Sequence, residues 1–335
     1  MDAAFVYARP QFVSTGLANN TKQCADVLVA EGWTSVALAL DEMGTSQGVD
    51  VWRPWMAEHA PRVVVFAAFT TPPAMIEELA SEWPETVWVQ RCHSNMAWLF
   101  TTRAFGSFLE ILRVAKRRRN VRLAFVSPDE SRRLRGCGLP VLTVPNVLCG
   151  DVAAEPLDGP GEGEELRLSA IFAIRGLKHP TGHFMAARLL AEGRRVRLLF
   201  QRERSDNKSW GDWLIQLGNA LGLSLGVEPY RAHRQFCEWI RSTVHVGLQM
   251  SMTESFNYVT LEHLKAGVPM VTSGAIPWCP WRVGWHEDAE GVVELVRGIL
   301  GDYRAASEMA LEAARRIQDV NRGLFVETMR TLLEE

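Results

Sequence analysis

The sequence predicts an α/β protein built from two doubly wound domains, each with a parallel sheet covered by helices. Three observations carry this prediction. Short apolar runs alternate with helical segments along the chain, which is typical of consecutive β-α-β units. The strand-like runs are continuously apolar, as in sheets buried on both faces. The length of 335 residues suits two domains of about 150 residues each.

Residues 1–150 are expected to form the first Rossmann-like domain. Its strands are the apolar runs "AFVYA", "SVALA", "RVVVFAAF", "TVWVQ", "RLAFV" and "VLTV". Its helices lie between these runs and span Asn19–Ala30, Pro72–Trp83, Thr101–Arg117 and Pro128–Arg135. The regular alternation predicts parallel strands with crossover helices.

Residues 151–165, within "GDVAAEPLDGPGEGEE", interrupt this pattern. The segment is rich in glycine, proline and acids and has no apolar period, so it predicts an inter-domain linker.

A second Rossmann-like domain is expected over residues 166–302, and residues 303–335 are expected to form a C-terminal helix crossing back toward the first domain. The strands of the second domain are "RLSAIFAI", "RVRLLF", "VHVGLQ" and "PMVTS", and its helices span His179–Ala191, Trp210–Leu221, Arg231–Arg241 and Phe256–Ala266, followed by two helices from Ala289 that separate near Gly301.

Composition and charge exclude several classes of protein. The net charge is −3, so the chain as a whole is not a strong polyanion binder. The N-terminal run resembles a strand and not a signal peptide, and no window is apolar enough to span a bilayer. The six cysteines are scattered without a C-x-x-C pair, which favours free thiols in a cytoplasmic protein with no membrane partner.

The segment "TESFNYVTLEHLKA" places two carboxylates, Glu254 and Glu262, around the start of a helix. We expect this helix to begin near Phe256 and to stop at Gly267. Free amides of a first turn bind anions, and a carboxylate can accept two hydrogen bonds from a vicinal diol. The pattern therefore suits a nucleotide-sugar. The alternative is two solvated glutamates on an amphipathic helix.

A second polar group follows the strand that ends at Ile174. Arg175 and Lys178 lie in the loop before the next helix, where two cations could neutralise a diphosphate. The alternative is an ordinary loop, because loops between strands and helices often carry basic residues.

Several segments resemble family 4 glycosyltransferases of the GT-B fold, in which two Rossmann-like domains face a central cleft. The E-x7-E pair of that family matches Glu254 and Glu262, and the "GVPMVTS" strand follows. "IRGLKHP" is similar to the family's diphosphate-binding segment, "LTVPNVLCGD" to the run before its second domain, and "WVQRCHS" to the strand that presents a histidine, here His93. The chain departs from the family at Asn257 and Val147, where glycine is usual, and in its first turn, "STGLANN".

The resemblance implies a retaining, metal-independent transfer from a nucleotide diphosphate sugar, with a UDP-sugar favoured and no cofactor. Arg175 and Lys178 would hold the diphosphate, Glu254 the sugar hydroxyls and Glu262 the ribose. His93 would bind the sugar or polarise the acceptor hydroxyl; the alternative is a structural histidine. The remaining implied donor contacts are Ser255, Phe256, Asn257 and Tyr258.

The sequence agrees with the resemblance on one point, because no D-x-D pair occurs. His179 and His183 lie four residues apart on an expected helix, but no third ligand accompanies them in the sequence. A surface or packing role is therefore expected for both, and no metal site is predicted.

The polar segment after the first strand offers acceptor-side candidates: Gly16, Asn19, Asn20 and Lys22. The form of the donor segment resembles bacteriophage enzymes that glycosylate hydroxymethylated pyrimidines in DNA, which would place the protein in the host cytoplasm.

Arg117, Arg118 and Arg119 belong to a basic cluster that could then contact DNA phosphates. The alternatives are a solvated helix face, a polysaccharide, lipid-linked or small-molecule acceptor, and a nucleotide-sugar-binding protein without turnover.

Overall fold

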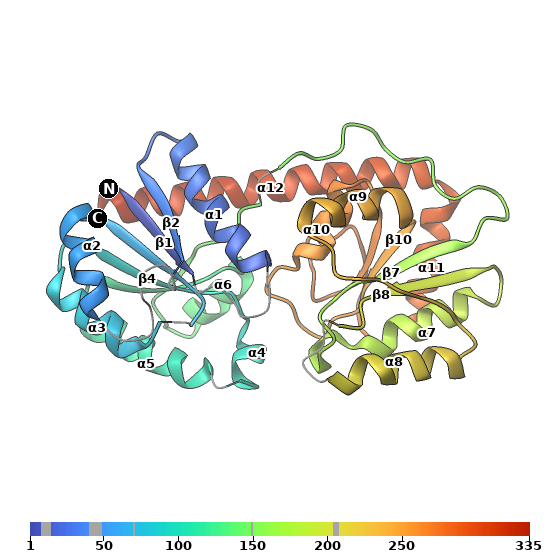
Figure 1. Ribbon diagram of the computed structural model, residues 1–335, viewed down its shortest axis with the longest axis horizontal. Helices are drawn as coiled ribbons and strands as arrows, with labels where there is room; N and C mark the ends of the chain where they lie inside the picture. The colour runs from blue at the N-terminus through green and yellow to red at the C-terminus, as the bar shows by residue number, and fades with distance from the viewer. Residues whose placement is uncertain (8–14, 40–48, 70, 103, 149, 204–207) are drawn as a thin grey trace. The chain divides into compact units, whose positions relative to one another are not determined.

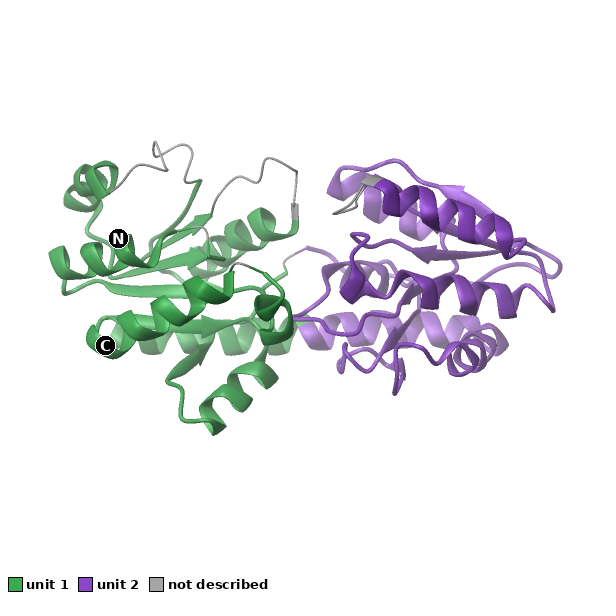
Figure 2. Cartoon of the chain, turned by 90° about the horizontal axis from the view of Figure 1, so that it is seen from below, with its two compact units in different colours: residues 1–149, 318–335 green, residues 150–317 purple. Residues whose placement is uncertain are grey.

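The computed structural model describes residues 1–7, 15–39, 49–69, 71–102, 104–148, 150–203 and 208–335. The chain divides into two compact units, one formed by Met1–Cys149 with Gln318–Glu335 and the other by Gly150–Ile317 (Figure 2). Each unit contains a six-stranded sheet in which all paired strands are parallel. The predicted α/β architecture with two parallel sheets is confirmed.

The sheet of the first unit has the strand order β2-β1-β3-β4-β5-β6 (Figure 1). Its strands are β1 (Ala3–Tyr7), β2 (Ser35–Ala39), β3 (Val63–Ala67), β4 (Val87–Cys92), β5 (Val121–Phe125) and β6 (Val141–Thr143). Its helical segments are α1 (Thr15–Ala30), η2 (Val49–Val51), α2 (Trp52–His59), α3 (Pro73–Glu82), α4 (Met96–Phe100), α5 (Ala104–Arg117) and α6 (Pro128–Gly136).

Both faces of this sheet are buried, as its continuously apolar strands predict. Along β1, Ala4 and Val6 pack toward α2, α3 and α5, whereas Ala3 and Phe5 pack toward α1 and the end of the chain. Successive strand side chains point to opposite faces, so each apolar strand fills two cores.

The end of the chain completes the second of these cores. The last helix, α12 (Tyr303–Glu334), contributes Phe325, Met329 and Leu332 to the face that carries Phe5 and Val65. Thr328 Oγ1 on this helix donates a hydrogen bond of 3.0 Å to the carbonyl of Thr143. The expected packing of C-terminal helical residues against the first domain is confirmed.

The sheet of the second unit has the strand order β12-β11-β10-β7-β8-β9. Its strands are β7 (Leu166–Ala170), β8 (Val196–Phe200), β9 (Ser224–Val227), β10 (Val246–Gln249), β11 (Met270–Ser273) and β12 (Trp281–Val283). Its helical segments, besides the start of α12, are η3 (Gly176–Lys178), α7 (Pro180–Leu190), α8 (Lys208–Ala220), α9 (His233–Thr243), α10 (Tyr258–Lys265) and α11 (Ala289–Gly301).

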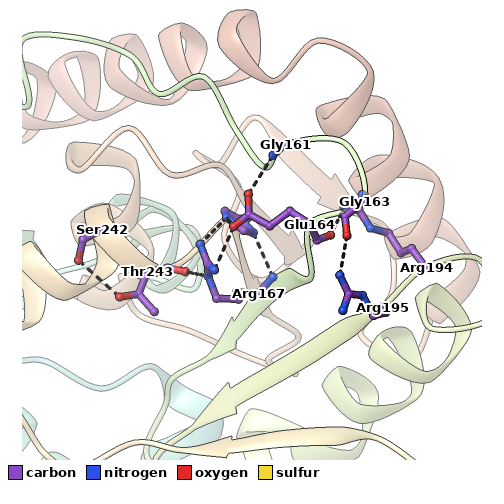
Figure 3. A network of polar contacts seen from close by, with 9 residues as sticks. Gly161, Gly163, Glu164, Arg167, Arg194, Arg195, Ser242 and Thr243 are labelled. Atoms are coloured by element: carbon purple, nitrogen blue, oxygen red, sulfur yellow. Dashed lines mark hydrogen bonds and ion pairs between the residues drawn. The ribbon is translucent and has the colours of Figure 1, made fainter.

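The acidic, glycine-rich segment before β7 is tied to the second unit by polar contacts (Figure 3). Glu164 accepts a hydrogen bond from the Gly161 amide at 2.9 Å and pairs with Arg167 at 3.0 Å. Arg195 donates to the Gly163 carbonyl at 2.7 Å. His245 is buried beside this network, and burial followed by the Arg167 charge lowers its pKa to about 4. The segment is therefore ordered by the start of the sheet beside it.

The sequence analysis misses the strands β9 and β12 and the short helices α2 and α4. Strands β9 and β12 are short edge strands, and β9 contains Gly226, so neither has the long apolar run that predicts a buried strand. Helix α2 carries Pro54 in its first turn, where the missing amide costs no hydrogen bond. The expected helix Thr101–Arg117 appears as α5, which begins at Ala104, whereas α4 ends at Phe100, before the expected range. None of the helices in the described ranges is long and apolar enough to cross a membrane.

Candidate functional site

The junction between β7 and β10 is the point where the strand order of the second sheet reverses. These strands are hydrogen-bonded neighbours although two other strands lie between them in sequence. In open α/β sheets, ligands bind beyond the carboxyl ends of strands at such a switch point. The segment containing η3 follows β7, and the loop leading to α10 follows β10. Two of the predicted site segments therefore meet at one edge of one sheet.

Glu254 and Lys178 form an ion pair at this junction. The Glu254 side chain is 8% exposed and that of Lys178 is 20% exposed. Glu254 Oε1 also accepts hydrogen bonds from Ser251 Oγ at 2.6 Å and from Asn257 Nδ2 at 2.8 Å. None of the described residues donates a hydrogen bond to its second oxygen, Oε2. The carboxylate is thus held by one oxygen and offers the other.

Asn257, which stands where the resembled family has glycine, has a positive φ of 76°. Asparagine tolerates this left-handed conformation better than most residues. Its Oδ1 accepts from the Thr260 amide at 2.9 Å and caps α10, while its Nδ2 donates to Glu254. One side chain therefore starts the helix and orients the carboxylate. Because the cap is Asn257, the helix begins at Tyr258 rather than near Phe256.

A short polar chain that the sequence analysis did not identify supports this loop. Gln249 Nε2 donates to Ser251 Oγ at 2.8 Å, and Ser273 Oγ donates to the Ser251 carbonyl at 2.5 Å. The Met252 amide donates to the Leu177 carbonyl at 2.9 Å, which joins this loop to η3. These contacts involve short side chains at strand ends, for which the sequence carries no distinctive pattern.

The other predicted donor residues surround the same loop. Arg175 directly precedes η3 and is half-buried. Phe256 is buried, stacks on Trp278 at 5.3 Å between ring centroids, and meets the Tyr258 ring edge-on at 5.4 Å. Ser255 is half-buried beside them. Phe256 thus packs the loop against an aromatic ring, whereas Arg175 stands in the same turn as Lys178.

Glu262 lies on α10, and its side chain contacts α9. Its Oε1 is 2.8 Å from His233 Nε2. Hydrogen bonding to Cys237 and then to Glu262 raises the pKa of His233 to about 10, so the histidine is protonated at neutral pH. The sequence prediction for Glu262 contained no such cation.

His93 directly follows β4 in the first unit and is half-buried. Its Nε2 is buried and has no hydrogen-bond partner among the residues described. Burial, followed by the charge of Arg91, lowers the pKa of His93 well below its usual value. The imidazole is therefore neutral at pH 7, the form that can accept a proton or a hydrogen bond.

The predicted acceptor-side residues occupy the first turns of α1. Gly16 and Asn19 are half-buried and Lys22 is exposed. Asn20 is fully buried: its Oδ1 accepts from Arg91 at 2.9 Å, and its Nδ2 donates to the Val147 carbonyl at 2.5 Å. Both polar atoms of its side-chain amide are therefore engaged within the first unit.

Arg91, which the sequence analysis did not single out, is fully buried on β4. It donates to the carbonyls of Val144 and Pro145 at 2.9 and 2.5 Å, and to Asn146 Oδ1 at 3.0 Å. These bonds replace the water lost on burial and determine the path of the "TVPNVL" segment. An arginine within a fully buried, mostly apolar strand was the available signal.

The three arginines proposed to contact DNA lie at the amino ends of the parallel strands, whereas His93 lies at their carboxyl ends. They end α5 and precede the start of β5, whereas His93 follows the end of β4. Arg117 makes two hydrogen bonds to Glu77, at 3.0 and 2.8 Å, and Arg118 lies 3.9 Å from the same carboxylate. Arg119 is exposed, whereas Arg118 is half-buried.

Comparison with known proteins gives matches in structure alone. No family model matches the sequence, and no curated protein matches it. A sucrose-phosphate synthase from Thermosynechococcus elongatus superimposes with a TM-score of 0.70 at 13% identity, covering 100% of both chains. The lipopolysaccharide outer core galactosyltransferase WaaB, in its apo form, gives 0.71 at 12% identity, covering 99% of both chains.

HepE of Anabaena, solved in complex with UDP, gives a TM-score of 0.63 at 12% identity, covering 100% of this chain and 98% of that one. These similarities extend over the whole chain and agree with its two parallel sheets. The chain therefore has the GT-B glycosyltransferase fold, as its sequence predicts.

Proposed function

We propose that this protein is a glycosyltransferase that moves a sugar from a nucleotide diphosphate sugar to an acceptor hydroxyl. The observation that carries the proposal is the Lys178–Glu254 pair at the β7/β10 junction. It joins a phosphate-binding cation to a hydroxyl-binding carboxylate at the edge where α/β sheets hold ligands. A UDP-sugar is the favoured donor, because a similar structure contains UDP.

The donor diphosphate would lie against Arg175, Lys178 and the amides that precede and begin α10. Positive groups placed where a leaving diphosphate gains charge stabilise the transition state. Lys178 would turn from Glu254 toward the phosphate, which would release Glu254 Oε1 as well as Oε2 for the sugar hydroxyls. Glu262 would accept the ribose hydroxyls through the oxygen that does not contact His233.

The proposed chemistry retains the configuration at the anomeric carbon and requires no metal. The bond from the anomeric carbon to the phosphate oxygen breaks, and its electron pair stays with the diphosphate. The acceptor oxygen bonds to the same face of that carbon, and its proton passes to the departing phosphate oxygen. His93, neutral at pH 7, would hydrogen-bond a sugar or acceptor hydroxyl through Nε2.

Glu254→Gln separates donor binding from transfer. We expect kcat/KM for sugar transfer to fall by about 10²–10³-fold, as for loss of one charge-stabilising group. Binding of UDP alone should be unchanged or tighter, because Lys178 loses its competing carboxylate. Calorimetry with UDP and product analysis with a panel of UDP-sugars measure the two effects.

Lys178→Met should weaken UDP binding, which Glu254→Gln should leave unchanged or strengthen. Loss of a charge-assisted hydrogen bond should weaken UDP binding by about tenfold or more. Glu290→Gln, an exposed carboxylate in the first turn of α11, is the matched control and should change neither quantity. Wild-type transfer by Glu254→Gln would contradict the donor-site assignment, and UDP binding with no turnover of any donor would favour a binding protein.

For the acceptor, we propose a hydroxymethylated pyrimidine in double-stranded DNA, on the basis of the donor-segment resemblance. Arg119, which is exposed, is the better candidate for a phosphate contact than Arg117 and Arg118, whose guanidinium groups lie beside Glu77. Mass spectrometry of hydroxymethylated duplex DNA after incubation with UDP-sugars should show added hexose or pentose. Transfer to lipid-linked or saccharide acceptors, with unmodified DNA, would replace this proposal.

A further inference from the structure

The turn that carries Lys178 ends in a histidine whose neighbours suit a metal ion. His179, His286 and Glu287 each offer one ligand atom, and the three atoms lie within 4.8 Å of one another. His179 ends the loop after β7, and the other two residues follow β12. Residues from two distant segments of the second unit therefore converge on one point.

We propose that His179, His286 and Glu287 form a binding site for Zn²⁺ or a similar transition-metal ion. Two imidazoles and a carboxylate are a donor set that zinc favours, with water completing a tetrahedral shell. The donor set disfavours Mg²⁺ and Ca²⁺, which prefer all-oxygen ligands. The site is separate from the proposed transfer, which needs no ion.

The hydrogen bonds of His179 select the tautomer that a metal requires. Its Nδ1 lies 3.2 Å from the His286 carbonyl oxygen, which can only accept a hydrogen bond, so Nδ1 carries the proton. The lone pair of the neutral ring is then on Nε2, which accepts a hydrogen bond from Thr181 Oγ1 at 3.3 Å and lies 3.8 Å from Glu287 Oε1. A bound ion would take the place of the Thr181 hydrogen bond. Metal-bound histidines commonly donate their second nitrogen to a carbonyl or carboxylate in this way.

Glu287 is oriented by a neighbouring side chain. Trp285 Nε1 lies 3.3 Å from Glu287 Oε2 and donates to it, which leaves Oε1 toward His179. The Trp285 ring also packs against the His286 ring at 4.5 Å between centroids. Ligand atoms of a tetrahedral zinc site are about 3.4 Å apart, so small rotations of the exposed Glu287 side chain would complete the site.

The backbone of His179 has an uncommon conformation at the proposed metal site. Its φ is 44°, in the left-handed region that non-glycine residues seldom adopt. Gly182 leaves room for the ring, because a Cβ there would lie 2.7 Å from His179 Nδ1. Conformations of this kind persist where the surroundings over-determine them, and they concentrate at functional sites. A bound ion would fix the turn that carries Arg175 and Lys178.

Cobalt is a direct probe, because Co²⁺ can replace Zn²⁺ and absorbs visible light strongly in a tetrahedral N/O site. We expect the full-length, untagged protein to bind one equivalent of Co²⁺ with such bands, and Zn²⁺ to displace it. His286→Ala and His179→Asn should abolish the bands, and Glu287→Gln should weaken Co²⁺ binding by at least about tenfold. Asparagine is chosen at 179 because it tolerates positive φ.

Glu290→Gln is the matched control and should bind Co²⁺ as the wild-type protein does. Zn²⁺ should raise the melting temperature of the wild type and the control, but not that of His286→Ala. Circular dichroism of each variant shows whether it is folded. Absence of visible Co²⁺ bands in the folded wild type, or bands that persist in His286→Ala, would overturn the proposal.

Discussion

Asn257 shows how a single side chain can satisfy two requirements of a site. Its backbone occupies the left-handed region, its carbonyl oxygen caps α10, and its amide nitrogen holds Glu254. The sequence marks Asn257 as a departure from the resembled family without indicating its consequence. The contacts show that asparagine replaces glycine at an acceptable backbone cost and adds two hydrogen bonds.

Substitutions at 257 should separate these effects. Asn257→Ala loses the cap and places a Cβ residue at positive φ, so we expect a loss of about 2 kcal/mol in the free energy of unfolding. Asn257→Gly keeps the backbone conformation and should lose less than about 1 kcal/mol. Urea denaturation measures both. Equal losses for the two variants would contradict a role of the left-handed conformation.

At the scale of elements, α9 and α10 are joined by the contact between His233 and Glu262. The sequence identified Glu262 from its spacing to Glu254. It could not identify His233, because the two helices are connected through β10 and their contact depends on how they pack on the sheet. Cys237, one turn along α9, lies 3.8 Å from the same imidazole.

This contact predicts a pH dependence. The pKa of His233 is raised by Cys237 and Glu262 from 6.5 to about 10 in the folded protein. A raised pKa stabilises the fold fully below pH 6.5, and the contribution is lost as pH rises toward 10. We therefore expect the wild type to lose stability over pH 7–10 relative to His233→Gln, as measured by urea denaturation at each pH. Parallel pH profiles for the two proteins would show that the contact contributes nothing.

At the scale of the whole molecule, the two ends of the sequence share one core. Phe325 packs against Phe5 with ring centroids 6.0 Å apart, and both residues are buried. The first unit is therefore incomplete without the last residues of the chain, Gln318–Glu335.

Phe325→Ala should destabilise the first unit by about 3–5 kcal/mol through loss of buried area and creation of a cavity. Hydrogen exchange should increase in β1, β3 and β4 and change little in β7 and β10, because the cavity lies within the first unit. The exposed Met309→Ala substitution on the same helix is the control. Uniform loss of protection across both sheets would show that the units unfold together.

The sequence by itself determined the alternation of strands and helices, the two-sheet fold and the segments that carry Glu254, Lys178 and His93. Periodicity and local motifs contain this information, because the burial of each strand or helix produces a regular pattern of apolar residues within that segment. Short edge strands such as β9 have too few buried residues to show such a pattern.

Tertiary structure alone decided which of these residues meet. Lys178 contacts Glu254 because β7 and β10 are neighbours in the sheet. Asn20 is buried and accepts a hydrogen bond from Arg91, and the His179 side chain lies beside those of His286 and Glu287. The physical reason is that pairing between distant segments depends on sheet order and helix packing, which no local pattern specifies.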